Sequence, residues 1–140
     1  MIRIDCSNWL INGEWASSIR RSVFIKEQGI DESEEWDVHD PVSIHAVAWL
    51  GQQAVGTARL LPEGKIGRMA VLPEFRSQGI GSAMLLALLA VARQQQMLQV
   101  RLSAQQHAIG FYSRHGFAPL GEPHMEVGIP HQWMAINLTT

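Results

Sequence analysis

The chain has 140 residues, 46% of them hydrophobic and 17% charged, with a formal net charge of -2 and one cysteine, Cys6. This composition predicts a single domain over residues 1–140 and excludes a disordered tail, an intrachain disulfide and a cysteine-rich zinc site. No basic stripe suggests a nucleic-acid partner, and the longest apolar run, Ala83–Ala92, is about half as long as a membrane span, so we expect a cytoplasmic protein without a membrane partner.

The N-terminal part of the chain predicts a strand followed by a helix. Ile2 and Ile4 flank a polar residue, as expected for a short strand. Apolar side chains then recur at intervals of four and predict a helix over Glu14–Gln28, which Gly29 would end. The acid-rich segment Asp31–Asp40 that comes next is interpreted as a loop or a loose helical turn.

Three strand-like runs lie in the middle of the chain and are separated by turns that contain Gly or Pro. Turns this short join antiparallel neighbours, so the three runs predict a meander. Its strands are expected at Ser43–Leu50, Ala54–Leu61 and Lys65–Leu72.

The second half of the chain alternates helices with strands. A polar loop, Pro73–Gly81, leads into an apolar helix over Ser82–Gln95 and then a strand over Gln99–Ala104. This strand should lie parallel to the last meander strand, because a helix connects the two. A short helix, Gln106–Arg114, and a C-terminal hairpin, whose second arm is His131–Leu138, complete a mixed α/β sheet with helices on both faces.

The loop between the last meander strand and the apolar helix has the chemistry of an anion site. Amides at a helix N-terminus favour an anion, and Gly79 and Gly81 lack the Cβ atoms that would keep a phosphate away. Arg76 adds a positive charge. A simpler explanation is that both glycines only form a tight turn. The spacing fits neither a Walker loop nor a dinucleotide-binding fingerprint.

At this loop the sequence resembles the GNAT superfamily of N-acyltransferases, since Arg76-Ser-Gln-Gly-Ile-Gly81 matches the family's pyrophosphate loop. The resemblance implies a GNAT-like α/β fold with a mixed, mostly antiparallel sheet and a splayed parallel strand pair. It also implies that acetyl-CoA is the co-substrate and that the backbone of Met69 and Val71 pairs with its pantetheine arm. The residues that the resemblance assigns to the cofactor are Met69, Ala70, Val71, Arg76, Ser77, Gln78, Gly79, Ile80 and Gly81.

A second stretch, Ala108–Phe117, resembles the family's Ala-x-x-Phe-Tyr-x-x-x-Gly-Phe segment. By that resemblance Tyr112, the one tyrosine of the chain, is the general acid that protonates the departing CoA thiolate. The alternative is a core aromatic side chain whose hydroxyl is satisfied within the protein. Four shorter segments resemble a small bacterial subgroup of the family: Val23–Gly29, Gly56–Arg59, Ser103–Gln105 and Gly128–His131.

One departure from the family's pattern leaves the general base open, because Lys65–Arg68, at the start of the fourth strand, contains no carboxylate. We expect Glu126 or His131 to act as the base, since they flank a turn that could lie above the acceptor site. Histidine is also suited because its side chain titrates near neutral pH. Glu27 and His107 come after them. Each of these side chains could equally be an ordinary surface residue.

The acceptor is expected at the end of the first helix, where Glu27 and Gln28 lie, and at Gln105, which stands where many family members carry an Asn. The six acids of Asp31–Asp40 could attract a cation, although such a run is more often a solvated loop. Trp36 could form a wall of the acceptor site. No group of His, Asp and Glu has metal-ligand spacing, so we expect no metal.

The sequence thus predicts an enzyme that moves an acetyl group from acetyl-CoA to the primary amine of a small molecule by direct attack. Two alternatives stay open: a non-catalytic acyl-CoA-binding sensor, which the missing carboxylate favours, and a protein or peptide N-acetyltransferase. The resemblance also suggests a homodimer formed through C-terminal strands.

Overall fold

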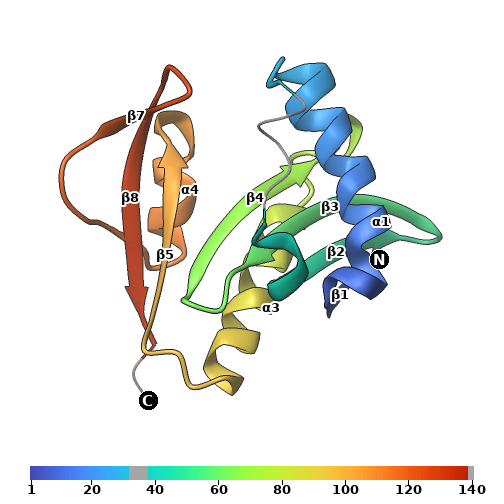
Figure 1. The fold of residues 1–140 in the computed structure, drawn as a ribbon, viewed down its shortest axis with the longest axis horizontal. Coiled ribbons are helices and arrows are strands. Elements are labelled where there is room, and N and C mark those ends of the chain that lie inside the picture. The colour runs from blue at the N-terminus through green and yellow to red at the C-terminus, as the bar shows by residue number, and fades with distance from the viewer. Residues whose placement is uncertain (32–37, 139–140) are drawn as a thin grey trace.

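The computed structural model describes residues 1–31 and 38–138. Within these residues eight strands form one sheet, and helices pack on both of its faces (Figure 1). The strand order is β1-β2-β3-β4-β5-β8-β6, and β7 pairs with β8 beyond this path. The paired strands are antiparallel except β4 and β5, which are parallel. The predicted mixed, mostly antiparallel sheet with one parallel pair is confirmed.

The meander strands form where the alternating pattern placed them. β2 spans Ile44–Leu50, β3 Gln53–Leu60 and β4 Lys65–Val71, each within one residue of its predicted ends. β1, Ile2–Ser7, pairs antiparallel with β2, and β5, Gln99–Gln105, lies parallel to β4. The predicted ends held because turns that contain Gly or Pro bound each meander strand. The interiors of β2 and β3 are buried on both faces, since helices cover both sides of the sheet.

The first helix begins at Trp9 rather than at Glu14 and changes type before it ends. α1 spans Trp9–Arg20, and the Asn8 side chain caps it by accepting a hydrogen bond from the Ile11 amide. The chain then continues as a π-helix, η1, over Arg21–Glu27, which confirms the predicted C-terminal end. The predicted start was wrong because apolar spacing alone gives no weight to Asn, a favoured N-cap residue.

The later helices agree with the sequence prediction. α3 spans Ile80–Gln94, and α4 spans Ile109–Arg114 directly after the 3-10 turn η4, Gln106–Ala108. Two further 3-10 turns, η2 (Asp40–Val42) and η3 (Pro73–Phe75), precede β2 and the loop before α3.

The C-terminal part contains more strand than predicted. β8 spans Ile129–Asn137, so the second arm of the hairpin begins before His131. β7, His124–Glu126, is its first arm, and the two-residue strand β6, Ala118–Pro119, also pairs with β8. β8 pairs with β5 on its other edge. The β7–β8 hairpin is thereby attached to β5.

The main core lies between α3 and the sheet. Leu85 and Leu88 of α3 are fully buried in it. A smaller cluster on the opposite face joins Ile19 of α1 and Val23 of η1 to Ala70 of β4. β4 is therefore packed from both sides, and its backbone is held in place where the sheet splits.

β4 and β5 are paired only near their N-terminal ends. Over the strands that the structure describes, two register pairs join them, Lys65 with Arg101 and Ile66 with Leu102, and beyond these the strands diverge (Figure 1). The Arg101 amide also donates to the Gly64 carbonyl at 2.9 Å. We call the resulting space the β4–β5 wedge: it is closed at this end and open toward the C-terminal ends of both strands.

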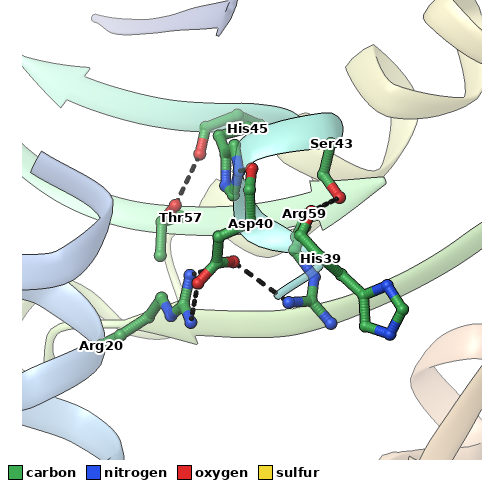
Figure 2. A network of polar contacts seen from close by, with 8 residues as sticks. Arg20, His39, Asp40, Ser43, His45, Thr57 and Arg59 are labelled. Carbon is green, nitrogen blue, oxygen red and sulfur yellow. Dashed lines mark hydrogen bonds and ion pairs between the residues drawn. The ribbon is translucent and has the colours of Figure 1, made fainter. Parts of the chain in front are cut away.

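A buried polar network fixes η2 against α1 and β3 (Figure 2). The Asp40 carboxylate accepts hydrogen bonds from Arg20 at 3.0 and 3.1 Å and from Arg59 at 3.1 Å, and all three side chains are buried. His45 Nε2 lies 2.9 Å from the Asp40 carbonyl, and the Asn12 side chain donates to the His45 carbonyl at 2.8 Å. The interpretation of the acidic run as solvated is therefore wrong for Asp40, which serves two buried arginines.

Candidate functional site

A cleft of about 600 Å³ opens in the β4–β5 wedge. Residues of η1, β3, β4, β5, α4 and the β7–β8 hairpin line it. Seven of the predicted site residues lie on its walls: Gln28, Met69, Gln105, His107, Tyr112, Glu126 and His131. The cleft therefore brings together the expected general acid, both leading candidates for the base, and side chains expected near the acceptor.

Tyr112, on α4, is partly buried at the cleft wall. Its hydroxyl donates to the Met69 sulfur at 3.7 Å, and its ring packs edge-on against Phe111 and Phe117. Burial raises the pKa of Tyr112 to about 12, so the hydroxyl keeps its proton at neutral pH. A thioether is a weak acceptor, so this proton is available to a better one that enters the cleft.

Glu126, on β7, is held by two neighbouring side chains. Its carboxylate accepts hydrogen bonds from Ser103 Oγ of β5 and, at 2.5 Å, from His124 Nε2. Burial opposes ionisation of Glu126, but these hydrogen bonds and the charges of His131 and His124 outweigh it and lower the pKa of the carboxyl. Glu126 is therefore ionised at neutral pH and can accept a hydrogen bond from an amine.

His131, on β8, presents a second possible proton acceptor to the same cleft. Its Nδ1 lies 2.8 Å from the Ile129 carbonyl, so this nitrogen carries the proton and Nε2 is the acceptor in the neutral ring. The rings of His131 and His124 have centroids 6.1 Å apart. Gln105 of β5 is the register partner of His131, which places the predicted acceptor-side amide beside the imidazole.

Two side chains of this cluster, His124 and Ser103, were not assigned a role from the sequence. His124 stacks on Trp133 with ring centroids 5.6 Å apart. Its spacing of two residues from Glu126 places both side chains on one face of a strand, a signal that was present in the sequence. The contact of Ser103 with Glu126 spans 23 positions of the chain and has no local signal.

The loop before α3 has backbone geometry suited to an anion. Ser77 and Gly79 have positive φ values of 63° and 82°, which turn the chain sharply ahead of the helix. A Cβ atom on Gly79 would meet nothing within 4 Å, so glycine is favoured there by its conformation rather than by crowding. In the part of the chain that the structure describes, no side chain caps α3, which leaves the first helical amides to an anion.

The remaining residues assigned to the cofactor differ in exposure. Gln78 is exposed, whereas Ile80 is buried in the main core and Ala70 is buried beneath η1. At Gly81, a Cβ atom would lie 3.5 Å from the Phe111 ring, an ordinary contact. The side chains of Ile80 and Ala70 therefore serve packing, and only their backbone can serve a ligand.

The Arg76 guanidinium is bound within the protein. Its Nη1 and Nη2 donate to the two Glu27 carboxylate oxygens at 2.8 and 2.6 Å, and its Nε donates to the Val71 carbonyl at 2.9 Å. The hydrogen bond from Arg76 lowers the pKa of Glu27. Glu27 therefore joins η1 to the loop of residues 76–79 before α3, which we call the anion loop, whereas its neighbour Gln28 lines the cleft.

A β-bulge interrupts β4 where the wedge opens. Arg59 of β3 pairs with Gly67, and Thr57 pairs with Ala70, so β4 contains one extra residue between these pairs. Arg68, within the bulge, has a φ of 50°, a left-handed conformation that L-residues adopt at some cost. The bulge thus ends the regular pairing of β4 beside the cleft.

Part of the predicted site lies outside the described residues, namely Trp36 and the acids Glu32, Glu34, Glu35 and Asp37. Across residues 1–31 and 38–138, no three His, Cys, Asp or Glu side chains are grouped closely enough to hold a metal ion. The helices of the same two ranges are all too short or too polar to cross a membrane.

Comparison with known proteins connects this geometry to one family. A family model described as Acetyltransferase (GNAT) domain matches residues 14–138. The uncharacterized N-acetyltransferase YjcF of Bacillus subtilis (strain 168) is 36% identical over 120 residues, covering 83% of this chain and 86% of that protein. An acyl-CoA N-acyltransferase structure from Pseudomonas aeruginosa is 30% identical, with a TM-score of 0.84, covering 97% of this chain and 99% of that one. The Escherichia coli ElaA structure is 26% identical with a TM-score of 0.86 and the same coverage, 97% and 99%.

Proposed function

Because the chain belongs to the GNAT family of acyltransferases, whose members take the acyl group from a CoA-derived donor, we propose that it acetylates the primary amine of a small molecule from acetyl-CoA. One observation carries the proposal: a proton acceptor, His131 Nε2, an ionised carboxylate, Glu126, and a protonated phenol, Tyr112, line the same cleft. Acyl transfer to an amine needs both a proton acceptor and a proton donor. We assign residues 1–140 to one such N-acetyltransferase domain.

The residues of the anion loop fit the diphosphate of CoA. The amides from Ser77 to Gly81 would hold the diphosphate, and the φ of 82° at Gly79 provides the required turn. The edge of β4 that faces the wedge, at Met69 and Val71, would hold the pantetheine arm by main-chain hydrogen bonds. When bound, acetyl-CoA supplies an acyl group already activated as a thioester.

The acceptor amine must lose a proton before it attacks. For an amine with a pKa about three units above the ambient pH, reaching the neutral form costs about 4 kcal/mol. In the proposed mechanism Glu126 orients the amine through a hydrogen bond and His131 Nε2 accepts the proton. The neutral nitrogen then forms a bond to the acyl carbon.

During the transfer, negative charge develops first on the acyl oxygen and then on the sulfur of CoA. We assign the Val71 amide to the acyl oxygen, since a main-chain donor fixed on a strand can stabilise negative charge without reorganisation. As the bond from carbon to sulfur breaks, Tyr112 donates its proton to the departing thiolate. The nitrogen gives up its second proton through solvent to the phenolate as the amide forms, and His131 releases its proton to solvent, which restores both side chains.

The first test is calorimetric titration of the protein with acetyl-CoA, followed by assays of free thiol release with a panel of small amines. We expect binding below millimolar ligand and amine-dependent thiol release. Glu126→Gln should bind acetyl-CoA as the wild type does and release thiol more slowly, by about 100-fold. Binding without thiol release for any amine would instead identify an acyl-CoA sensor.

A further inference from the structure

The closed end of the β4–β5 wedge holds two cationic side chains next to each other. Lys65 and Arg101 are register partners on parallel strands, so their side chains project from the same face of the sheet. Both line the cleft. Like charges on neighbouring strands repel, and such a pair lowers stability unless an anion lies between the two groups.

Among the residues that the structure describes, the side chains around this pair compensate for its charge only in part. Glu63 Oε2 lies 3.8 Å from the Arg101 guanidinium, and both side chains are substantially exposed, at 53% and 39%. An ion pair of this length and exposure is weak. The Lys65 ammonium lies 5.2 Å from the centre of the Trp133 ring, a cation–π contact that supplies no negative charge.

The cationic pair lies at a fixed spacing from the groups proposed to handle the amine. Arg101 and Ser103 are two residues apart on β5 and share one face, about 7 Å apart along the strand. Ser103 holds the Glu126 carboxylate. Trp133, the register partner of Ser103, provides an aromatic surface between the two ends. The cleft thus has a negative pole for an amine and a positive pole for an acid.

We propose that the acceptor is a small amine that also carries an acidic group, a carboxylate or a phosphate, and that Lys65 and Arg101 bind this group. The inference rests on the proposed function, since it names the acceptor that the same cleft takes. The ammonium end would face Glu126, and the acid would replace the weak partner Glu63 at Arg101. Charge-assisted hydrogen bonds to both cations would then orient the amine for attack.

The test compares acceptors that differ only in the acidic group. Thiol release is measured for propylamine, 4-aminobutanoate and 3-aminopropyl phosphate. We expect kcat/KM to be about tenfold or more higher for an acidic member than for its neutral analogue. The carboxylate and phosphate arms show which acid the site takes. Equal or better use of the neutral amines overturns the inference.

Variants of Lys65 and Arg101, which form the positive pole, distinguish a loss of acid recognition from a loss of folding. Lys65→Met and Arg101→Met should raise KM for the acidic acceptors about tenfold and leave kcat/KM for propylamine nearly unchanged. Arg93→Met, an exposed position near the end of α3, is the matched control and should change neither. Glu63→Gln should lower KM for the acidic acceptors, because it removes a competing carboxylate. Equal losses for acidic and neutral acceptors in the Met variants contradict the inference.

A binding measurement distinguishes failure of this inference from failure of the proposed function. 4-Aminobutanoate and 3-aminopropyl phosphate are titrated into the protein saturated with CoA, with propylamine as the neutral reference. Binding that depends on the acidic group and is lost in Lys65→Met supports the anion site even where no amine releases thiol, and only the proposed function then fails. Binding that ignores the acidic group overturns the inference.

Discussion

Two ionisable side chains that line the cleft, Tyr112 and Glu126, have pKa values shifted in opposite directions, although burial alone would raise both. At Tyr112 burial acts with little opposition, because the hydroxyl meets a thioether, and the pKa rises to about 12. At Glu126 burial is outweighed by donors, because Ser103 and His124 both stabilise the carboxylate. One group is thus fixed as a proton donor and the other as an anion at the same neutral pH, the separation that acid–base chemistry requires.

Tyr112→Phe tests the proposed role of the Tyr112 hydroxyl as the proton donor. The ring contacts with Phe111 and Phe117 are retained, so only the hydroxyl proton is lost. We expect kcat to fall by about 100-fold or more while the Kd of acetyl-CoA stays within about twofold. Steady-state kinetics and calorimetry on the same preparation measure the two quantities. An unchanged kcat would remove Tyr112 from the mechanism.

At the scale of elements, the Arg76–Glu27 pair connects two parts of the site that lie far apart in the sequence. It joins the π-helix η1 to the loop before α3, over 49 positions of the chain. Both side chains are exposed by about two fifths, 41% and 38%. Such a pair adds little to folding stability. Its position therefore matters more for the geometry of the loop and for the charge that CoA would meet there under the proposed function.

Substitutions at this pair should separate stability from binding. Arg76→Met is expected to change Tm by no more than about a few degrees but to weaken CoA binding about tenfold, because a positive charge beside the diphosphate is lost. Glu27→Gln is the matched control: it breaks the same ion pair, keeps the arginine, and should leave CoA binding unchanged or tighter. Thermal denaturation and calorimetry measure both effects. Equal weakening by the two variants would show that the ion pair, not the arginine charge, matters.

The turn between β3 and β4 fixes the closed end of the wedge by close approach of two backbones. A Cβ atom on Gly64 would lie 2.7 Å from the Gln99 carbonyl oxygen, and Gly64 has a φ of 94°. Gly64→Ala should therefore lower the free energy of unfolding by about 1–3 kcal/mol more than a substitution that is strained in φ alone. Gly51→Ala is that control, since Gly51 has a φ of 60° and nothing within 4 Å. Urea denaturation measures the difference, and equal losses would contradict it.

Elements with a regular pattern could be predicted from the sequence, and contacts across the sheet could not. The meander strands follow from short runs bounded by turns that contain Gly or Pro, and α3 follows from its long apolar run. The start of α1 was missed because apolar spacing gives no weight to the Asn8 N-cap. Gly13, a poor helix former, lies within this helix with the Trp9 ring beside it. The π-helical form of η1 has no sequence period that distinguishes it from an α-helix.

In the candidate site, too, residues with a local sequence signal could be predicted, and their contacts across the sheet could not. Tyr112, Glu126 and His131 could be selected from motifs and spacing, and they do line one cleft. Their partners could not be selected, because the contact of Ser103 with Glu126 depends on how β5, β8 and β7 lie in space. The pairing of Lys65 with Arg101 likewise follows only from the register of two parallel strands.

At the scale of the molecule, the buried network at η2 links folding stability to pH. Burial lowers the pKa of His45 and, with the charges of Arg20 and Arg59, outweighs the hydrogen bond to the Asp40 carbonyl and the Asp40 charge, which act to raise it. Since the folded-state pKa lies below the unfolded value of about 6.5, the unfolded chain takes up the proton first as the pH falls. His45 thus contributes its full stability above about pH 6.5 and loses it progressively below that pH.

Calorimetric melting between about pH 8 and pH 5 tests this linkage. The wild-type Tm should decline as the pH falls below about 6.5. His45→Gln should have a lower Tm at about pH 8, because it disturbs the contact with the Asp40 carbonyl, and a shallower decline at acid pH. Identical slopes for the two proteins would assign the pH dependence to other groups.

The split between β4 and β5 has a consequence for how the protein behaves in concentrated solution. Past Ile66 and Leu102, β4 and β5 no longer pair with each other, although their outer edges still pair with β3 and β8. Exposed strand edges of this kind recruit extended segments from other molecules. The pantetheine arm of a bound CoA would cover one of these edges, so the ligand would also reduce self-association of the protein.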